Sequence, residues 1–231
     1  MNVPKDLSVE KLNELIRTLI QSDQPIVFTT YTFPHTTEQY MEKVLSLFFE
    51  AVQQKAMADY AIYFIKELIG NAKKANAKRV YFKEKRLDIH RVEDYLEGMK
   101  TFKIDLLENK DHYLALQKKR GLYIRLKLWK EEERIKIEVS NNSRITTVEE
   151  KRMVNKITMG KQYKALESLM MSEAIDDTEG SGLGLIVLVL MMNKLGTSAE
   201  KIKIVKGENE TKIRVEIQLI KEKQEMQAAP A

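Results

Sequence analysis

Three polar residues stand at helical spacing within the string ELIGNAKKA, residues 67–75. Glu67, Asn71 and Lys74 are separated by four and three positions, so a helix would carry them on one face. An amide oxygen there suits Mg²⁺ beside phosphate groups, and a carboxylate one turn earlier could orient or deprotonate a water or hydroxyl. Because the solvated face of an ordinary helix has a similar composition, this stripe alone does not assign a site.

A glycine-rich run, Gly180-Ser181-Gly182-Leu183-Gly184, stands at the start of a second predicted helix. Glycine permits positive φ and close approach of the backbone, and free amides at a helix N-terminus attract anions such as phosphate. The spacing is not that of a dinucleotide-binding fingerprint, and the absence of a following Gly-Lys-Ser/Thr excludes a Walker A loop. Tight packing of a helix against a sheet is the alternative explanation for these glycines.

Together, the two motifs resemble the GHKL ATPase superfamily. That superfamily holds the ATP-binding domains of sensor histidine kinases, anti-sigma serine kinases, DNA gyrase, MutL and the ninety-kilodalton heat-shock chaperone. Glu67 and Asn71 match its N-box, and Gly180, Gly182 and Gly184 match its second glycine box. The layout of this chain is closest to that of stand-alone histidine-kinase-like ATPase domains.

The resemblance implies a fold and a set of roles. The fold would be α/β, a two-layer sandwich of the Bergerat type with a mixed, mostly antiparallel sheet covered on one face by helices. ATP would lie between helices under a lid at about residues 143–179. Asn71 would bind Mg²⁺ and the phosphates, Lys74 would contact phosphate, and Glu67 would be the general base. The glycine-rich turn, including Leu183, would hold the triphosphate.

One motif departs from the family pattern, which is Asp-x-Gly-x-Gly after a strand. Asn141 replaces the aspartate that accepts a hydrogen bond from the adenine amino group, and Ser143 replaces the first glycine. An asparagine side chain has one acceptor and two donors, so it could still accept this bond. The bond would lose the charge assistance of a carboxylate, which accounts for about half its strength. We therefore expect ATP to bind with weakened adenine recognition.

None of the three histidines, His35, His90 and His112, stands in the sequence context of a phosphoacceptor. Any phosphoacceptor is therefore expected on another protein. The leading hypothesis is a cytoplasmic ATP-binding signalling protein, an ATPase or kinase of the histidine-kinase-like type that phosphorylates a partner protein. The alternative is a catalytically silent nucleotide-binding or interaction module with the same fold. Nucleic-acid work of the gyrase or MutL kind is not expected, because no transducer region follows the predicted sheet.

Periodicity predicts the elements that must position these residues. Helices are expected from a cap at Ser8 to about residue 21, after a cap at Thr36 or Thr37, and at residues 58–76, 148–157 and 182–195. Strands are expected at residues 26–33, 79–85, 122–128 and 135–139, followed by a closing hairpin around residues 206–209.

The same pass along the chain divides it into three parts. Residues 1–23 form a helical appendage that could pack on the domain or mediate a homodimer. By the resemblance, residues 24–220 would form the ATP-binding domain, in which the charged stretch 87–120 would be an insertion of one or two helices. Residues 221–231 have lost apolar periodicity and are expected to be a flexible tail.

Composition narrows the possible chemistry further. The chain of 231 residues has no cysteine, which excludes disulfides, thiolate nucleophiles and cysteine metal sites. Its 39 basic and 34 acidic residues are interspersed, so the net charge of +5 gives little reason to expect nucleic acid as a partner. The start of the chain lacks a signal-peptide pattern and the longest apolar run is too short to cross a bilayer, so no membrane partner is expected.

Overall fold

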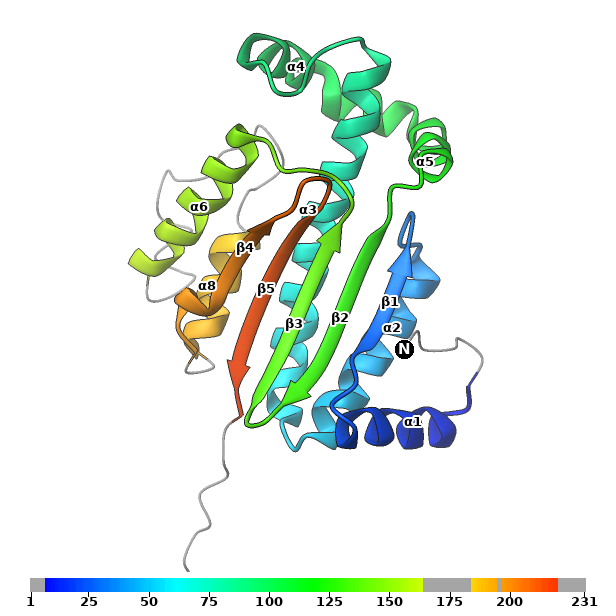
Figure 1. The fold of residues 1–231 in the computed structure, drawn as a ribbon, viewed down its shortest axis with the longest axis vertical. Coiled ribbons are helices and arrows are strands. Elements are labelled where there is room, and N and C mark those ends of the chain that lie inside the picture. The colour runs from blue at the N-terminus through cyan, green and yellow to red at the C-terminus, as the bar shows by residue number, and fades with distance from the viewer. Residues whose placement is uncertain (1–6, 164–183, 195–196, 220–231) are drawn as a thin grey trace, which may run out of the picture.

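The computed structural model of the chain describes residues 7–163, 184–194 and 197–219. At its centre lies one sheet of five strands in the order β1-β2-β3-β5-β4, with a layer of helices behind it (Figure 1). The two-layer α/β architecture confirms the fold class predicted from the sequence. All four pairings among the described strands are antiparallel, so this part of the sheet is wholly antiparallel and not mixed as expected. The strands are β1 Ile26–Thr30, β2 Ile124–Glu131, β3 Arg134–Asn141, β4 Ile202–Lys206 and β5 Thr211–Gln218.

The helical layer is built from segments that are far apart in the sequence. Two short 3₁₀ turns, Lys55–Met57 and Ala199–Lys201, lead into α3 and β4 respectively. The α-helices are α1 Val9–Gln21, α2 His35–Ala51, α3 Ala58–Glu84, α4 Val92–Glu108, α5 Lys110–Lys119, α6 Thr147–Gln162 and α8 Gly184–Lys194.

Strand β3 lies at the middle of the sheet, and its alternation decides which side chains reach the helices. Val139 pairs with Leu126 of β2 and Ile213 of β5, and all three side chains are buried in the main core. The β2–β3 hairpin turns between Glu131 and Arg134, with Glu132 at a φ of 53°. Because β3 then ends at Asn141, this residue emerges at the edge of the core beside the helical layer.

The first two helices confirm one predicted cap and correct another. Ser8 caps α1 by accepting from the backbone N–H of Lys11, and α1 packs its apolar face onto the domain. Helix α2, however, begins at His35, so the predicted caps at Thr36 or Thr37 are wrong. Pro34 is the N-cap, and its carbonyl accepts from the N–H groups of residues 37 and 38, which draws both threonines into the first turn.

Helix α3 continues to Glu84 with Lys85 as its C-cap, so the strand predicted at residues 79–85 is wrong. The second half of α3 enters a separate core that it shares with α4 and α5 at the top of Figure 1. Tyr81 meets Phe102 edge-on at 5.2 Å between ring centroids, and Phe82 stacks on Tyr95 at 5.7 Å. Aromatic and β-branched residues favour strands only when a sheet is there to receive them, and here two helices bury them instead. The one or two helices predicted within residues 87–120 are present as α4 and α5.

Two other segments differ from the predicted pattern. Strand β1 stops at Thr30 rather than at residue 33, because Phe33 takes a φ of 49° and Pro34 follows it. Met159 and Gly160 were expected in a mobile lid, but both lie in α6, where Gly160 packs against Val189 of α8.

Several predictions fall outside the described residues. These include the lid beyond residue 163, the glycine-run members Gly180, Gly182 and Leu183, and the tail at 221–231. Among the helices that are described, none combines the length and the apolar run that crossing a bilayer would require.

Two helical glycines offer a matched test of the second core. A Cβ at Gly98 of α4 would lie 2.7 Å from Phe82 Cζ, whereas a Cβ at Gly70 of α3 would meet nothing within 4 Å. Gly70→Ala is expected to raise the free energy of unfolding by about 0.5–1 kcal/mol through helix propensity. Gly98→Ala is expected to lower the free energy of unfolding by about 1–3 kcal/mol because of overpacking. Urea unfolding followed by circular dichroism measures both, and equal effects would contradict the packing described for the second core.

Candidate functional site

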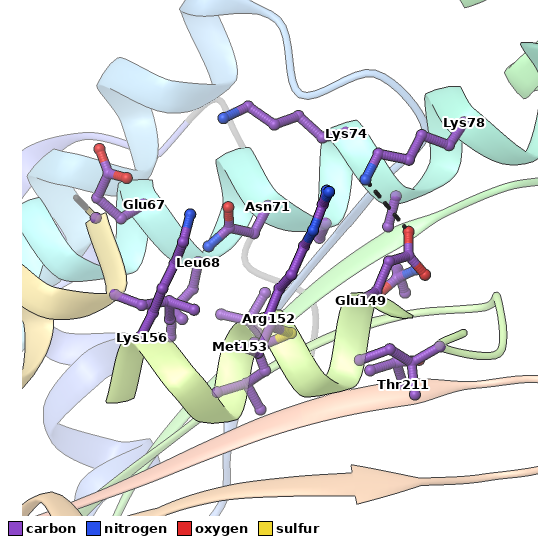
Figure 2. A pocket seen from close by; sticks show the side chains of 18 of the residues that line it. Glu67, Leu68, Asn71, Lys74, Lys78, Glu149, Arg152, Met153, Lys156 and Thr211 are labelled. Carbon is purple, nitrogen blue, oxygen red and sulfur yellow. Dashed lines mark hydrogen bonds and ion pairs between the residues drawn. The ribbon is translucent and has the colours of Figure 1, made fainter. Parts of the chain in front are cut away.

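A cavity of about 140 Å³ lies between α3, α6, the start of α8 and the adjoining parts of β3 and β5 (Figure 2). Both apolar and polar side chains line it. Five of the predicted site residues line it, namely Glu67, Asn71, Lys74, Asn141 and Gly184. It also takes in polar residues that were not predicted, namely Lys78, Arg79, Glu149, Arg152, Lys156 and Thr211.

The predicted polar stripe on α3 forms one wall of the cavity. Leu68 and Ala72 are buried in the main core, which turns Glu67, Asn71 and Lys74 toward the opening. Glu67 and Asn71 are half-buried and Lys74 is exposed. No hydrogen bond joins the Asn71 side chain to another residue in the described part of the chain, so its amide is available to a ligand.

Glu67 lies directly against the first residue of α8. A Cβ built on Gly184 would overlap the Glu67 carboxylate, with the Glu67 Cδ only 2.7 Å away. The glycine is therefore required here because the carboxylate occupies the space of a side chain. An acidic group is also favoured at a helix N-terminus, where the backbone N–H groups carry partial positive charge.

Helix α6 supplies the opposite wall and carries two cations that the motif analysis missed. In Figure 2 the Arg152 and Lys156 side chains rise from α6 toward Asn71 and Lys74 on α3. The spacing of residues 149, 152 and 156 on a predicted helix was the signal that could have found them. Among the described residues that line the cavity, cations outnumber carboxylates, which favours an anionic ligand.

A buried ion pair fixes α6 to α3. The Arg79 guanidinium donates to both oxygens of Glu149 at 2.6 and 3.2 Å, and Lys78 Nζ lies 3.5 Å from Oε1. Glu149 also accepts from the backbone N–H of Thr146 at 3.0 Å, which completes a capping box at the start of α6. Burial by itself raises the pKa of Glu149, but the hydrogen bond and charge of Arg79, with Lys78 and Thr146, lower it from 4.5 to about 2.

Tyr95 of α4 contacts two of the residues that line the cavity. The Tyr95 hydroxyl lies 3.3 Å from Lys78 Nζ and 3.2 Å from an Nη1 of Arg152, and both cations also lie near the face of its ring. The second core therefore supports two of the cations that line the cavity. The sequence left the role of this insertion open, and the structure assigns it this supporting contact.

Asn141 lies at the end of β3 with only 5% of its surface exposed. Its Nδ2 donates to Asn76 Oδ1 at 3.1 Å and to Ser143 Oγ at 2.5 Å. Asn76 belongs to α3 and was not predicted as a site residue, because its proximity to Asn141 depends on how α3 crosses the sheet. The position expected to recognise adenine is thus held by a buried hydrogen-bond network.

The ion pair leads to a prediction about acid stability. Because the pKa of Glu149 is lowered on folding, its contribution is complete above about pH 4.5 and is lost as the pH falls through about 2. At about 1.4 kcal/mol per pKa unit, the contribution is about 3 kcal/mol at pH 7. Glu149→Gln should lower the free energy of unfolding by that order at pH 7 and should flatten its decline between pH 4.5 and 2.

Urea unfolding across this pH range measures the effect. The matched control is Glu150→Gln, which removes a surface pair with Lys206 at 2.9 Å and should cost less than about 1 kcal/mol. Parallel pH profiles for Glu149→Gln and the unmutated protein would contradict the prediction.

Comparison with known proteins adds one relative. No protein-family model matches the chain, and no solved structure matches it. A protein of Treponema pallidum (strain Nichols), described as an uncharacterized protein, is 41% identical over 198 residues. The match covers 86% of this chain and 38% of that protein, so the chain spans about two fifths of the length of this relative. The relative carries no named activity, and the functional conclusion depends on the chemistry of the cavity.

Proposed function

We propose that the chain is a histidine-kinase-like member of the GHKL superfamily that binds Mg-ATP in this cavity and phosphorylates a partner protein in the cytoplasm. One observation carries the proposal. Glu67 and Asn71 from α3, Asn141 from the end of β3 and Gly184 from the start of α8 line the same cavity. These are the described members of the motifs that resemble the superfamily.

The charge of the cavity supports an anionic ligand with several negative charges. Glu149 is already neutralised by Lys78 and Arg79, so these three residues leave one net positive charge. Among the described residues that line the cavity, Lys74, Arg152 and Lys156 add three further cations and Glu67 adds one carboxylate. The phosphate chain of a nucleotide suits such a lining, because Lys and Arg pair with phosphate oxygens through charge-assisted hydrogen bonds.

Mg²⁺ fits the donor set only as part of a phosphate complex. The described residues include no group of three His, Asp or Glu that could hold a metal ion by themselves. Asn71 would contribute one amide oxygen, with the remaining ligands coming from phosphate and water, as is usual for Mg²⁺. When bound, the ion would offset phosphate charge.

Glu67 would act as the general base. Its carboxylate lies beside the start of α8, and Asn71, one turn later on α3, lines the same cavity. In transfer to a partner, Glu67 would accept the proton of the attacking hydroxyl while that oxygen bonds to the terminal phosphorus and the bond to the bridging oxygen of ADP breaks. Lys156 and Arg152 would stabilise the negative charge on the phosphate oxygens during this step.

Nucleotide binding is the first test. Isothermal titration with Mg-ATP is expected to show saturable binding, and Asn71→Ala should abolish it because the amide that faces the phosphates is lost. Asn193→Ala is the matched control, because Asn193 is an exposed amide on α8 outside the cavity, and it should bind like the unmutated protein. Absence of binding by the unmutated protein at millimolar nucleotide would refute the proposed function.

Turnover separates the enzyme from the catalytically silent alternative. Glu67→Gln keeps the shape of the side chain but cannot accept a proton, so phosphate release or transfer should fall by about 10²–10⁴-fold while Mg-ATP still binds. Glu14→Gln, on the exposed side of α1, is the control and should retain full activity. Mg-ATP binding with the same background turnover in both variants and in the unmutated protein, with or without partners, would favour the silent module.

A further inference from the structure

A short series of buried amides underlies the wall of the cavity. Asn76 of α3 is fully buried, and its Nδ2 donates to the backbone carbonyl of Tyr123 at 3.1 Å. A backbone carbonyl can only accept a hydrogen bond. The amide of Asn76 therefore has one permitted orientation, with its Oδ1 directed away from Tyr123.

The orientation of the Asn76 amide in turn fixes the orientation of the Asn141 amide. Asn76 Oδ1 lies 3.1 Å from the Nδ2 of Asn141, which donates its second hydrogen to Ser143 Oγ at 2.5 Å. If the Asn141 amide were rotated by half a turn, two carbonyl oxygens would face each other at about this distance in a buried site. An unpaired buried polar group costs about 1–3 kcal/mol, so the observed orientation is strongly preferred.

Both donors of Asn141 are consumed in this network, and its acceptor remains. Oδ1 accepts no hydrogen bond from another residue in the described part of the chain. Among the described residues, one side-chain polar atom is both shielded from solvent and without a hydrogen-bond partner, namely Oγ1 of Thr197. Asn141 Oδ1 is therefore not sealed off, and since Asn141 lines the cavity, this oxygen faces the ligand space.

We infer that Asn76 is a positioning residue that sets the base specificity of the cavity by locking Asn141 as a hydrogen-bond acceptor. The inference rests on the proposed nucleotide binding and deepens it. A purine with an exocyclic amino group at this position can donate to Oδ1, whereas a purine with a keto oxygen there places two acceptors together. A free asparagine could rotate and accommodate either base, so the selectivity comes from Asn76 and not from Asn141 alone.

The experiment compares ATP with inosine triphosphate, which carries a keto oxygen in place of the adenine amino group. The dissociation constants of both Mg-nucleotides are measured by titration. The unmutated protein is expected to prefer ATP by about tenfold or more, the range expected for one buried hydrogen bond. In Asn76→Ala the Asn141 amide can rotate, so the ratio of the two constants should fall toward one, mainly because inosine triphosphate binds better relative to ATP.

Asn142→Ala is the matched control. The Asn142 side chain also ties the start of β2, accepting from the Tyr123 N–H at 2.6 Å and donating to the Gly121 carbonyl at 2.9 Å, but it does not line the cavity. Loss of this side chain should lower the free energy of unfolding and leave the ratio of the two dissociation constants unchanged. A purely structural role for Asn76 would give the same result as this control and would overturn the inference.

A second variant keeps the test decisive if Asn76→Ala does not fold. Ser143→Ala removes the other partner of the Asn141 Nδ2 and leaves the bond to Asn76, so it should retain the preference for ATP. Loss of the preference in Ser143→Ala would overturn the role given to Asn76. Equal affinity of the unmutated protein for both nucleotides would overturn the inference and leave nucleotide binding standing, whereas binding of neither would refute the proposed function itself.

Discussion

The buried ion pair between Glu149 and Arg79 is the interaction on which the cavity depends. Helix α6 packs on α8 through Gly160, but it is held to α3 through this carboxylate. Burying a carboxylate is costly, and here the guanidinium, Lys78 and a backbone N–H from the capping box all stabilise the charged form. Glu149 belongs to the capping box of α6 and also ties this helix to α3. It therefore determines where Arg152 and Lys156, in the next two turns, lie.

Helix α3 links two cores. Its first half lies in the main core with the sheet, and its second half lies among the aromatic rings of α4 and α5. The polar residues of the cavity occur where the helix passes from one core to the other. Tyr95 then connects the second core to Lys78 and Arg152, so α4 supports two cations of the cavity without lining it.

The sequence was sufficient for most of the fold but only for part of the site. Alternation predicted β2, β3 and the closing hairpin, because each strand buries one face. It failed at Val80, Tyr81 and Phe82, since β-forming residues and a fully buried helix have the same composition. The spacing of Thr146 and Glu149 already matched a capping box. The partnership of Asn76 with Asn141 could not be predicted, because it depends on the relative placement of α3 and β3.

The contact between Glu67 and Gly184 links two positions that are far apart in the sequence. The Glu67 carboxylate and a Cβ at position 184 would occupy the same volume, so the two residues cannot vary independently. Relatives that keep a glutamate at position 67 in this conformation must keep glycine at position 184. An aspartate, one methylene shorter, would leave room for an alanine. The residues at these two positions are therefore expected to change together among relatives.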